Sequence, residues 1–183
     1  NVFKGETCVF PPETTHEETA TERNTTEEVT YQTEVQVPEA ISITDINIVK
    51  DQFFSRDGVE EDIFGNIYDE YVWTVVGGVG AQNKICEEYV TQGKYKRLTG
   101  TLFVDKDAPD KNSFKMKIYV DGKKIFTSPT IEKKTKPYSF DVDVSGAEFV
   151  KLEIVLVEGT SSMESGWYEE ARAFIANAEF SSE

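Results

Sequence analysis

The stretch from Gly93 to Ser128 constrains the fold most, because apolar residues recur at every second position over residues 114–120. Asp121-Gly122 ends this pattern, and this dipeptide favours the positive φ angles of a tight hairpin turn. Residues 124–127 then begin a return strand. The alternating apolar residues are Phe114, Met116, Ile118 and Val120, separated by Lys115, Lys117 and Tyr119. A period of two is typical of a half-buried strand, so the stretch predicts consecutive antiparallel strands.

Similar patterns recur along the rest of the chain. Apolar positions indicate strands near residues 41–48, 68–73, 95–104, 138–144, 150–156 and 171–180. Gly65-Asn66 and Ser145-Gly146 supply turns between them, whereas the charged segment 51–61 is typical of a loop. About nine or ten short strands at regular spacing, with no long helical stripe, predict an all-β fold. We expect an antiparallel β-sandwich or jelly roll over residues 41–183.

The first 40 residues differ in composition from this domain. They hold nine Thr and nine Glu against one Lys and one Arg, and the middle of the segment has no apolar periodicity. This composition is typical of an acidic, solvated arm or linker. Residues 28–37 alternate strictly and predict a strand, which could be added to the sheet of a neighbouring subunit. We therefore expect an extended N-terminal arm over residues 1–40, with homo-oligomerisation through it as one hypothesis.

Charge and hydropathy disfavour several classes of function. The formal net charge of −15 disfavours binding to nucleic acid or to an anionic membrane surface. No run of 18 apolar residues is present, so the sequence predicts no transmembrane helix. The lone histidine, His16, lies in the acidic arm, and no serine or cysteine of the domain has a histidine to activate it. We expect a protein that is not an enzyme.

The two cysteines, Cys8 and Cys86, lack the spacing of a zinc or iron–sulfur site. They are disulfide candidates within one chain or between chains in an oxidising compartment. The alternative is one exposed thiol and one buried small hydrophobic residue. The sequence does not decide between these alternatives.

Three blocks of the domain resemble the bacterial NPCBM family of carbohydrate-binding modules. They are GKYKRLTGTLFVDKDA, FKMKIYVDGKKIFTS and PYSFDVDVSGAEFVKLEIV, and together they cover about residues 93–155. AFIANAEF matches the position of the family's last strand. The resemblance implies a jelly-roll-like sandwich, export from the cell with the signal already removed, and attachment to a larger carbohydrate-active or adhesive protein.

One departure from the family concerns its motif near the last strand, D-x-x-W-A-D, which accompanies sugar or calcium binding. Here Ile175 takes the tryptophan position and Asn177 takes that of the final aspartate. A hard cation prefers carboxylate ligands, so this departure disfavours calcium and the family's sugar site at this motif.

Sugar recognition needs an aromatic ring as a platform together with planar polar groups. Trp167 and Tyr168 follow a polar loop and are our first candidates, although loop aromatics also cover the ends of sandwiches. Tyr71 and Trp73, with Tyr68, are further platforms, but Trp73 lies in an apolar strand, which favours core packing as its role.

Asp105, Asp107 and Asp110 share one short loop and form a weak candidate site for Ca²⁺. The alternative is a solvated acidic turn that Lys106 and Lys111 partly balance. No other cofactor is predicted.

The sequence favours an extracellular or cell-surface module that binds a glycan or another surface polymer. A structural alternative is a self-assembling subunit of a surface fibre or layer, in which the arm exchanges strands between neighbours. A third is an accessory domain of a larger enzyme.

Overall fold

The computed structural model describes residues 38–55, 58–76, 84–108, 110, 113–158 and 171–183 of the chain. These residues form fourteen strands. The strands are β1 (Ala40–Ser42), β2 (Ile48–Lys50), β3 (Phe54–Ser55), β4 (Glu60–Glu61), β5 (Ile67–Tyr68), β6 (Tyr71–Val76), β7 (Lys84–Val90), β8 (Arg97–Val104), β9 (Ser113–Val120), β10 (Lys123–Thr127), β11 (Ile131–Glu132), β12 (Tyr138–Asp143), β13 (Phe149–Glu158) and β14 (Ala171–Ser181).

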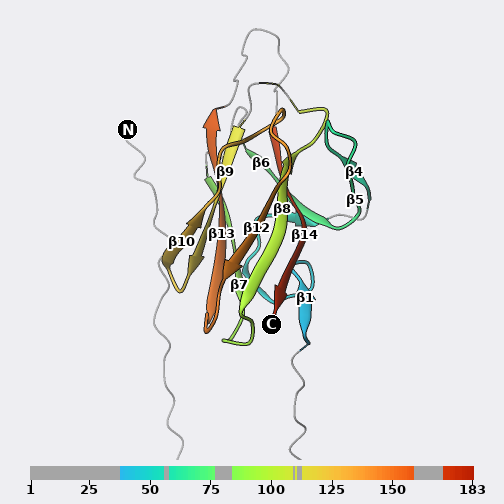
Figure 1. Cartoon of the computed structure of the whole chain (residues 1–183). Helices are drawn as coiled ribbons and strands as arrows, with labels where there is room; N and C mark the ends of the chain where they lie inside the picture. The colour runs from blue at the N-terminus through green and yellow to red at the C-terminus, as the bar shows by residue number, and fades with distance from the viewer. Residues whose placement is uncertain (1–37, 56–57, 77–83, 109, 111–112, 159–170) are drawn as a thin grey trace, which may run out of the picture. The chain divides into compact units, whose positions relative to one another are not determined.

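Two antiparallel sheets form a sandwich (Figure 1), as the alternation predicted. The first sheet has the order β12-β8-β14-β6-β3, with β1 paired to β14. The second has the order β10-β9-β13-β7-β2, with β11 paired to β9. One core fills the space between them, and Leu98, Leu102, Ile118, Leu152 and Ile154 are fully buried there. Burying one such side chain contributes about 1.5–3 kcal/mol, so the inward faces of the long strands hold the sandwich together.

The hairpin between β9 and β10 confirms the prediction made from its sequence. Lys123 pairs with Val120, and the two turn residues Asp121 and Gly122 have φ angles of 48° and 77°. Both angles lie in the left-handed region that Asp and Gly tolerate better than most residues. The local sequence therefore sets the register of this edge of the second sheet.

A two-stranded ribbon, β4–β5, was not predicted, because its segment falls partly in the charged stretch that we expected to be a loop. Glu60 pairs with Tyr68 and Glu61 with Ile67. Two-residue strands leave no measurable periodicity in a sequence. The ribbon lies beside the first sheet (Figure 1), to which the bridge between Asp62 and Asp105 ties it.

The ribbon helps to form a second apolar cluster on the outer face of the first sheet. Tyr68 stacks on Phe103 with ring centroids 4.1 Å apart, and Phe103 stacks on Phe174 at 4.9 Å. Tyr71 and Ala176 complete the buried part of this cluster, and Trp73 packs against it. The described part of the domain therefore has two buried apolar clusters: the main core between the sheets, and this smaller cluster on the outer face of the first sheet.

The predicted strand at residues 28–37 and most of the arm lie outside the described residues, so both stay predictions. Within the part of the chain that the structure describes, no helix has the length and apolarity needed to cross a bilayer.

Candidate functional site

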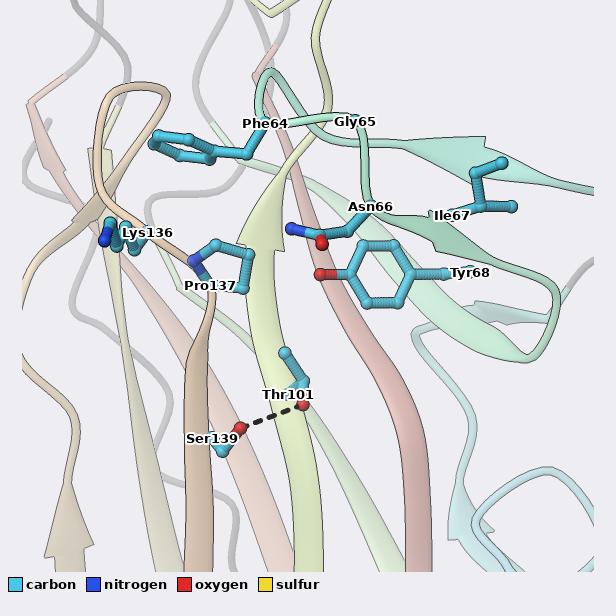
Figure 2. Close-up of a pocket in the computed structure, with 9 residues that line it drawn as sticks. All are labelled: Phe64, Gly65, Asn66, Ile67, Tyr68, Thr101, Lys136, Pro137 and Ser139. Atoms are coloured by element: carbon cyan, nitrogen blue, oxygen red, sulfur yellow. Dashed lines mark hydrogen bonds between the residues drawn. The ribbon is translucent and has the colours of Figure 1, made fainter.

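A groove of about 930 Å³ opens between the β4–β5 ribbon and the start of β12 (Figure 2). Three segments that are distant in sequence build it: the ribbon, β8, and the loop that leads into β12. We call it the Phe64 groove. Its lining residues are Phe64, Gly65, Asn66, Ile67, Tyr68, Thr101, Lys136, Pro137 and Ser139.

Phe64 gives the groove an aromatic surface. Its side chain is 46% exposed although it is large and apolar, and Figure 2 shows the ring extending toward the loop of Lys136 and Pro137. Ile67 is more exposed, at 69%, but it points away from the centre of the groove in the same view. Exposed aromatic rings with polar neighbours mark binding surfaces more often than single exposed aliphatic residues do.

Polar groups line the same groove. The hydroxyl oxygens of Thr101 on β8 and Ser139 on β12 are 3.3 Å apart, because the two strands are neighbours in the first sheet. Asn66 presents its side-chain amide from the ribbon, and Lys136 lines the opposite wall. The groove thus combines an amide, two hydroxyls and an amine with an aromatic ring.

Asp62 fixes the conformation of the turn that carries Phe64 and Asn66. Its Oδ1 accepts hydrogen bonds from the backbone N–H groups of Phe64 at 2.8 Å and Asn66 at 3.0 Å. Its Oδ2 accepts from Asn66 Nδ2 at 2.8 Å and from the Tyr68 hydroxyl at 3.1 Å. Gly65 completes the turn with a φ of 81°, an angle that favours glycine. One carboxylate therefore fixes the backbone that carries Phe64 and orients the side-chain amide of Asn66.

The electrostatics of the turn are consistent with an ionised Asp62. Burial alone would raise the pKa of this carboxyl, but the hydrogen bonds from Asn66, Phe64 and Tyr68 lower it below its usual value. The same contacts shift the pKa of the Tyr68 hydroxyl in the opposite direction, upward. Burial, together with the negative charge of Asp62 and the hydrogen bond to it, raises the pKa of Tyr68 to about 12.

The ribbon is anchored to the end of β8 by both main-chain and side-chain contacts. The backbone N–H of Lys106 donates to the Glu61 carbonyl at 3.1 Å. Its Nζ lies 2.7 Å from Glu61 Oε2, and this pair is exposed. Together with the stacking of Tyr68 on Phe103, these contacts hold one wall of the groove against the sheet.

Chemically, the groove suits a sugar ring. An aromatic ring packs against the C–H face of a pyranose, and amide and hydroxyl groups exchange hydrogen bonds with its hydroxyls. The ring and the polar groups line the same groove, as this mode of recognition requires.

Two aromatic residues that the sequence suggested as platforms lie elsewhere. Tyr71 is only 4% exposed and packs edge-on against Phe174 at 5.4 Å, so its ring faces are not available to a ligand. Trp73 is partly buried and stacks over Phe174 at 6.3 Å. Both belong to the outer apolar cluster rather than to the Phe64 groove. Trp167 and Tyr168 lie outside the described residues, and their role stays a prediction.

The three aspartates suggested for calcium are not brought together. Asp105 is 6% exposed, and its Oδ1 accepts from the backbone N–H of Asp107 at 2.7 Å. Asp110 instead lies 3.2 Å from Lys134 Nζ and 3.8 Å from Lys133 Nζ. Among the residues described, no group of three or more His, Cys, Asp or Glu side chains is arranged to hold a metal ion.

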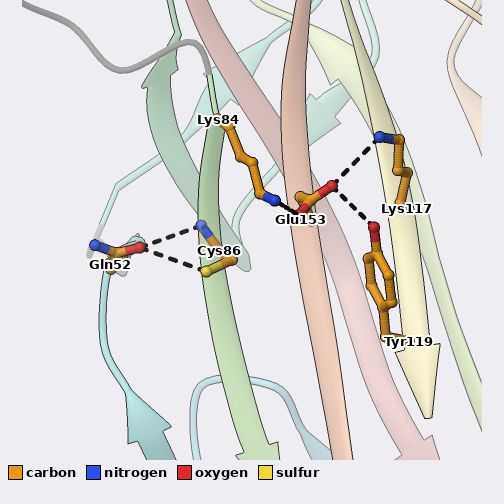
Figure 3. Close-up of polar contacts among 6 residues, drawn as sticks. All are labelled: Gln52, Lys84, Cys86, Lys117, Tyr119 and Glu153. Carbon is orange, nitrogen blue, oxygen red and sulfur yellow. Dashed lines mark hydrogen bonds and ion pairs between the residues drawn. The ribbon is translucent and has the colours of Figure 1, made fainter. Parts of the chain in front are cut away.

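Cys86 is buried on β7, with 5% of its surface exposed. Its Sγ lies 3.7 Å from Gln52 Oε1, which also accepts from the Cys86 backbone N–H at 3.2 Å (Figure 3). Cys8 falls outside the described residues, so pairing between the two cysteines stays untested.

Comparison with known families assigns the chain to a domain family. The sequence model of the NPCBM/NEW2 domain matches residues 74–173, which is more than half of the chain. The chain belongs to the NPCBM/NEW2 domain family. This membership confirms the resemblance seen in residues 93–155. The matched range includes Thr101, Lys136 and Ser139, whereas the ribbon that carries Phe64 precedes it.

Solved structures similar to this NPCBM/NEW2 domain are carbohydrate-binding modules of Clostridium perfringens. One is CBM51-2 of ZmpB with its INT domains in complex with GlcNAc, at a TM-score of 0.59 and 18% identity. The match covers 78% of this chain and 31% of that one. Another is CBM51 from GH95 in complex with methyl-galactose, at a TM-score of 0.54 and 15% identity, covering 78% and 99%. At these identities the similarity establishes the sandwich fold. No curated protein matches the chain in sequence.

A third similar structure contains the M60 catalytic domain of ZmpB with CBM51-1 and CBM51-2. Its TM-score is 0.56 at 16% identity, and the match covers 78% of this chain and 15% of that one. The NPCBM/NEW2 chain thus spans less than a third of the two ZmpB structures.

The departure from the family motif has a structural counterpart. Ile175, at the tryptophan position, is 1% exposed and packs in the main core. Asn177, at the aspartate position, has a φ of 48° at a bulge in β14, and its N–H donates to the Glu70 carbonyl at 3.0 Å. Asn tolerates this left-handed conformation. Asn177 thus adopts the left-handed conformation at this position, but it does not supply the carboxylate of the family motif.

Sequence reasoning missed Phe64, Asn66, Thr101, Lys136, Pro137 and Ser139 as groove residues. The available signal was an aromatic residue directly before the Gly65-Asn66 turn. Such a residue is placed at a loop tip, where binding groups are often found. The other residues carry no local signal, because only the folded ribbon brings them together.

Proposed function

We propose that this NPCBM/NEW2 domain is a non-catalytic glycan-binding module and that the Phe64 groove is its binding site. The observation that carries the proposal is that the exposed Phe64 ring lines one groove together with the Asn66 amide and the Thr101–Ser139 hydroxyl pair. Membership of a carbohydrate-binding family supports the ligand class. The relatives solved with GlcNAc and methyl-galactose suggest uncharged sugars as first probes.

The geometry supports recognition of one or two sugar rings at the end of a glycan. The groove is large enough for such a ligand. Its ribbon wall carries the Phe64 ring and the Asn66 amide, and its opposite wall carries Lys136 and Pro137, while Thr101 and Ser139 add hydroxyls from β8 and β12. We further propose that the module acts outside the cell, on a glycan of a cell surface or matrix, as carbohydrate-binding modules of exported proteins do.

Isothermal titration calorimetry with galactose and GlcNAc tests the site. Phe64→Ala removes the aromatic surface, and we expect at least about fivefold weaker binding, which corresponds to about 1 kcal/mol of lost apolar contact. Phe149→Ala is the matched control, because Phe149 is also an exposed phenylalanine, at 38%, but lies at the start of β13 in the second sheet. The control should bind as the unchanged protein does.

Equal affinities for Phe64→Ala and the control would contradict the assignment of the groove. If Trp167→Ala abolished binding in the same series while Phe64→Ala had no effect, the site predicted from the sequence would replace it. Assembly through residues 1–40 remains a separate hypothesis. Light scattering of a variant that lacks residues 1–28 tests it, because an unchanged oligomeric state would exclude assembly through the arm.

A further inference from the structure

A cationic face lies on the outer side of the second sheet, away from the Phe64 groove. Side chains on β7, β9 and β13 alternate between the core and the outside, and four outward positions carry lysine. We call these residues the lysine face: Lys84 on β7, Lys115 and Lys117 on β9, and Lys151 on β13. The whole chain has a net charge of −15, so this concentration of positive charge runs against its overall balance.

Strand register places the four lysines around one buried residue, Glu153. Glu153 pairs with Lys117 on one side and with Cys86 on the other. Two residues farther along β13, Val155 pairs with both Lys115 and Lys84. Neighbouring strands lie about 4.8 Å apart, so the backbones at Lys115 and Lys84 are about 10 Å apart across three strands.

Glu153 fixes two of the lysine side chains. It is 1% exposed, and its Oε2 lies 2.6 Å from Lys84 Nζ (Figure 3). Its Oε1 lies 3.3 Å from Lys117 Nζ and accepts from the Tyr119 hydroxyl at 3.0 Å. Burial alone would raise the pKa of Glu153, but the contacts with Lys84, Tyr119 and Lys117 lower it, so the carboxylate stays ionised. Two ammonium groups are therefore held close to the sheet.

A third ammonium is also held in position. Lys151 Nζ lies 4.3 Å from the centroid of the Tyr119 ring, within the range of a cation–π contact. Groups that are ordered before binding lose less conformational entropy when a ligand arrives. Three of the four lysines therefore present preorganised positive charge.

Acidic residues of the same strands do not cancel this charge. Glu153 is one carboxylate shared between two lysines. Glu88, on β7, pairs in the sheet register with Lys151 of β13 on one side and with Lys50 of β2 on the other, so two lysines flank this second carboxylate. The face keeps a net positive charge in a chain that is otherwise acidic.

We propose that the lysine face binds an anionic polysaccharide, one that carries carboxylate or sulfate groups along its chain. The charges are spread across three strands, so an extended polymer reaches them together and a compact ion does not. The polysaccharide is negatively charged and the lysine face is positively charged, and this electrostatic attraction increases both affinity and association rate. This site is independent of the Phe64 groove and does not require that the groove binds sugar.

Binding of the full chain to polygalacturonate and to dextran sulfate tests the proposal, with dextran as the uncharged polymer. Lys115→Gln/Lys151→Gln removes two charges and leaves the contacts of Glu153 with Lys84 and Lys117 intact. Lys133→Gln/Lys134→Gln is the matched control, because it removes the same charge from the lysines around Asp110. We expect both anionic polymers to bind, dextran not to bind, and the first variant to bind about tenfold more weakly than the control.

Added salt should weaken binding of the unchanged protein more steeply than that of Lys115→Gln/Lys151→Gln, because fewer charges interact in the variant. Equal weakening by both double variants would overturn the proposal, since net charge alone would explain it. It would also be overturned if neither polymer bound, or if only an acidic peptide such as residues 11–28 of this chain bound. Thermal melting of both variants establishes that they are folded.

Discussion

Replacement of Asp62 by Asn tests the role assigned to this carboxylate in the Phe64 groove. Asp62 is 3% exposed and accepts four hydrogen bonds within one turn. Asn has nearly the same shape, but it replaces one acceptor oxygen by an NH₂ group that only donates. This NH₂ group would face either the Asn66 Nδ2 donor and the Tyr68 hydroxyl or the two backbone N–H groups of the turn. The substitution therefore removes charge and acceptor capacity with little change in packing.

The magnitude follows from which donors lose their partner. Phe64 and Asn66 are exposed, so water can accept hydrogen bonds from their N–H groups in place of the carboxylate. The hydroxyl of Tyr68 belongs to a residue that is only 7% exposed, and water replaces its partner less easily. Hydrogen bonds to a charged group contribute about 1.5–3 kcal/mol. We expect Asp62→Asn to lower the free energy of unfolding by about 2 kcal/mol near neutral pH.

The pH dependence of this difference provides a second measurement. The pKa of Asp62 in the folded protein lies below the ordinary value of 3.8. A lowered pKa means that the stabilisation is present above pH 3.8 and is lost as the pH falls through the folded pKa. Urea unfolding followed by tryptophan fluorescence should therefore show the two proteins converging in stability in acid. Calorimetry on the same samples should show weaker sugar binding by Asp62→Asn near neutral pH, because Phe64 and Asn66 lose their common anchor.

Two results would refute this reasoning. One is a difference in unfolding free energy below about 0.5 kcal/mol near neutral pH, within the usual range of surface substitutions. The other is a difference that does not narrow in acid, since it would then arise from packing rather than from an ionised carboxylate. Tyr68→Phe separates the contribution of the hydroxyl, because it removes that donor and leaves the stacking on Phe103 in place.

Two further predictions concern the sandwich and the ribbon. Gly100→Ala places a Cβ 2.7 Å from Cζ of Phe140, so we expect the free energy of unfolding in urea to fall by about 1–3 kcal/mol. Adding Phe140→Leu to this variant should recover part of the lost stability. An unchanged urea midpoint for Gly100→Ala would contradict the prediction, because the ring would then move away freely. Stability should also fall by up to about 2.7 kcal/mol as the pH rises from about 10 to about 12, because the raised pKa of Tyr68 favours the folded state only while the phenol is protonated. Tyr68→Phe should flatten this slope, and equal slopes in the two proteins would contradict the assignment.

Much of the sandwich could be predicted from local pattern alone. The strand from Ser113 to Val120 buries Phe114, Met116 and Ile118, the residues that the period of two selected. Its Asp121-Gly122 turn has the expected backbone, and the inward residues Phe140 and Val142 of β12 follow the same rule. These features depend on side-chain alternation and turn chemistry, both of which are encoded within a few residues.

The site could not be predicted in this way, because it depends on contacts between distant segments. Tyr71 and Trp73 occupy outward positions of β6, and the sequence offers both as candidate sugar platforms while it favours core packing for Trp73. In the fold, Phe103, Phe174 and Tyr68 cover this part of the sheet. The same ribbon that supplies Tyr68 also brings Phe64 and Asn66 toward β8 and β12. Its strands have two residues each, which is too short for any periodicity.

The two outer faces of the sandwich therefore differ in a way that determines how function should be tested. On the first sheet, aromatic residues are buried by the ribbon, and the exposed binding groups gather at its margin in the Phe64 groove. On the second sheet, lysines surround a buried carboxylate and leave a positively charged surface. A ring stacked on Phe64 should be nearly insensitive to salt, whereas a polymer on the lysine face should be released by it. Salt titration with a neutral sugar and with an anionic polymer thus distinguishes the two sites in one protein, and an identical salt dependence for both ligands would mean that they share a single site.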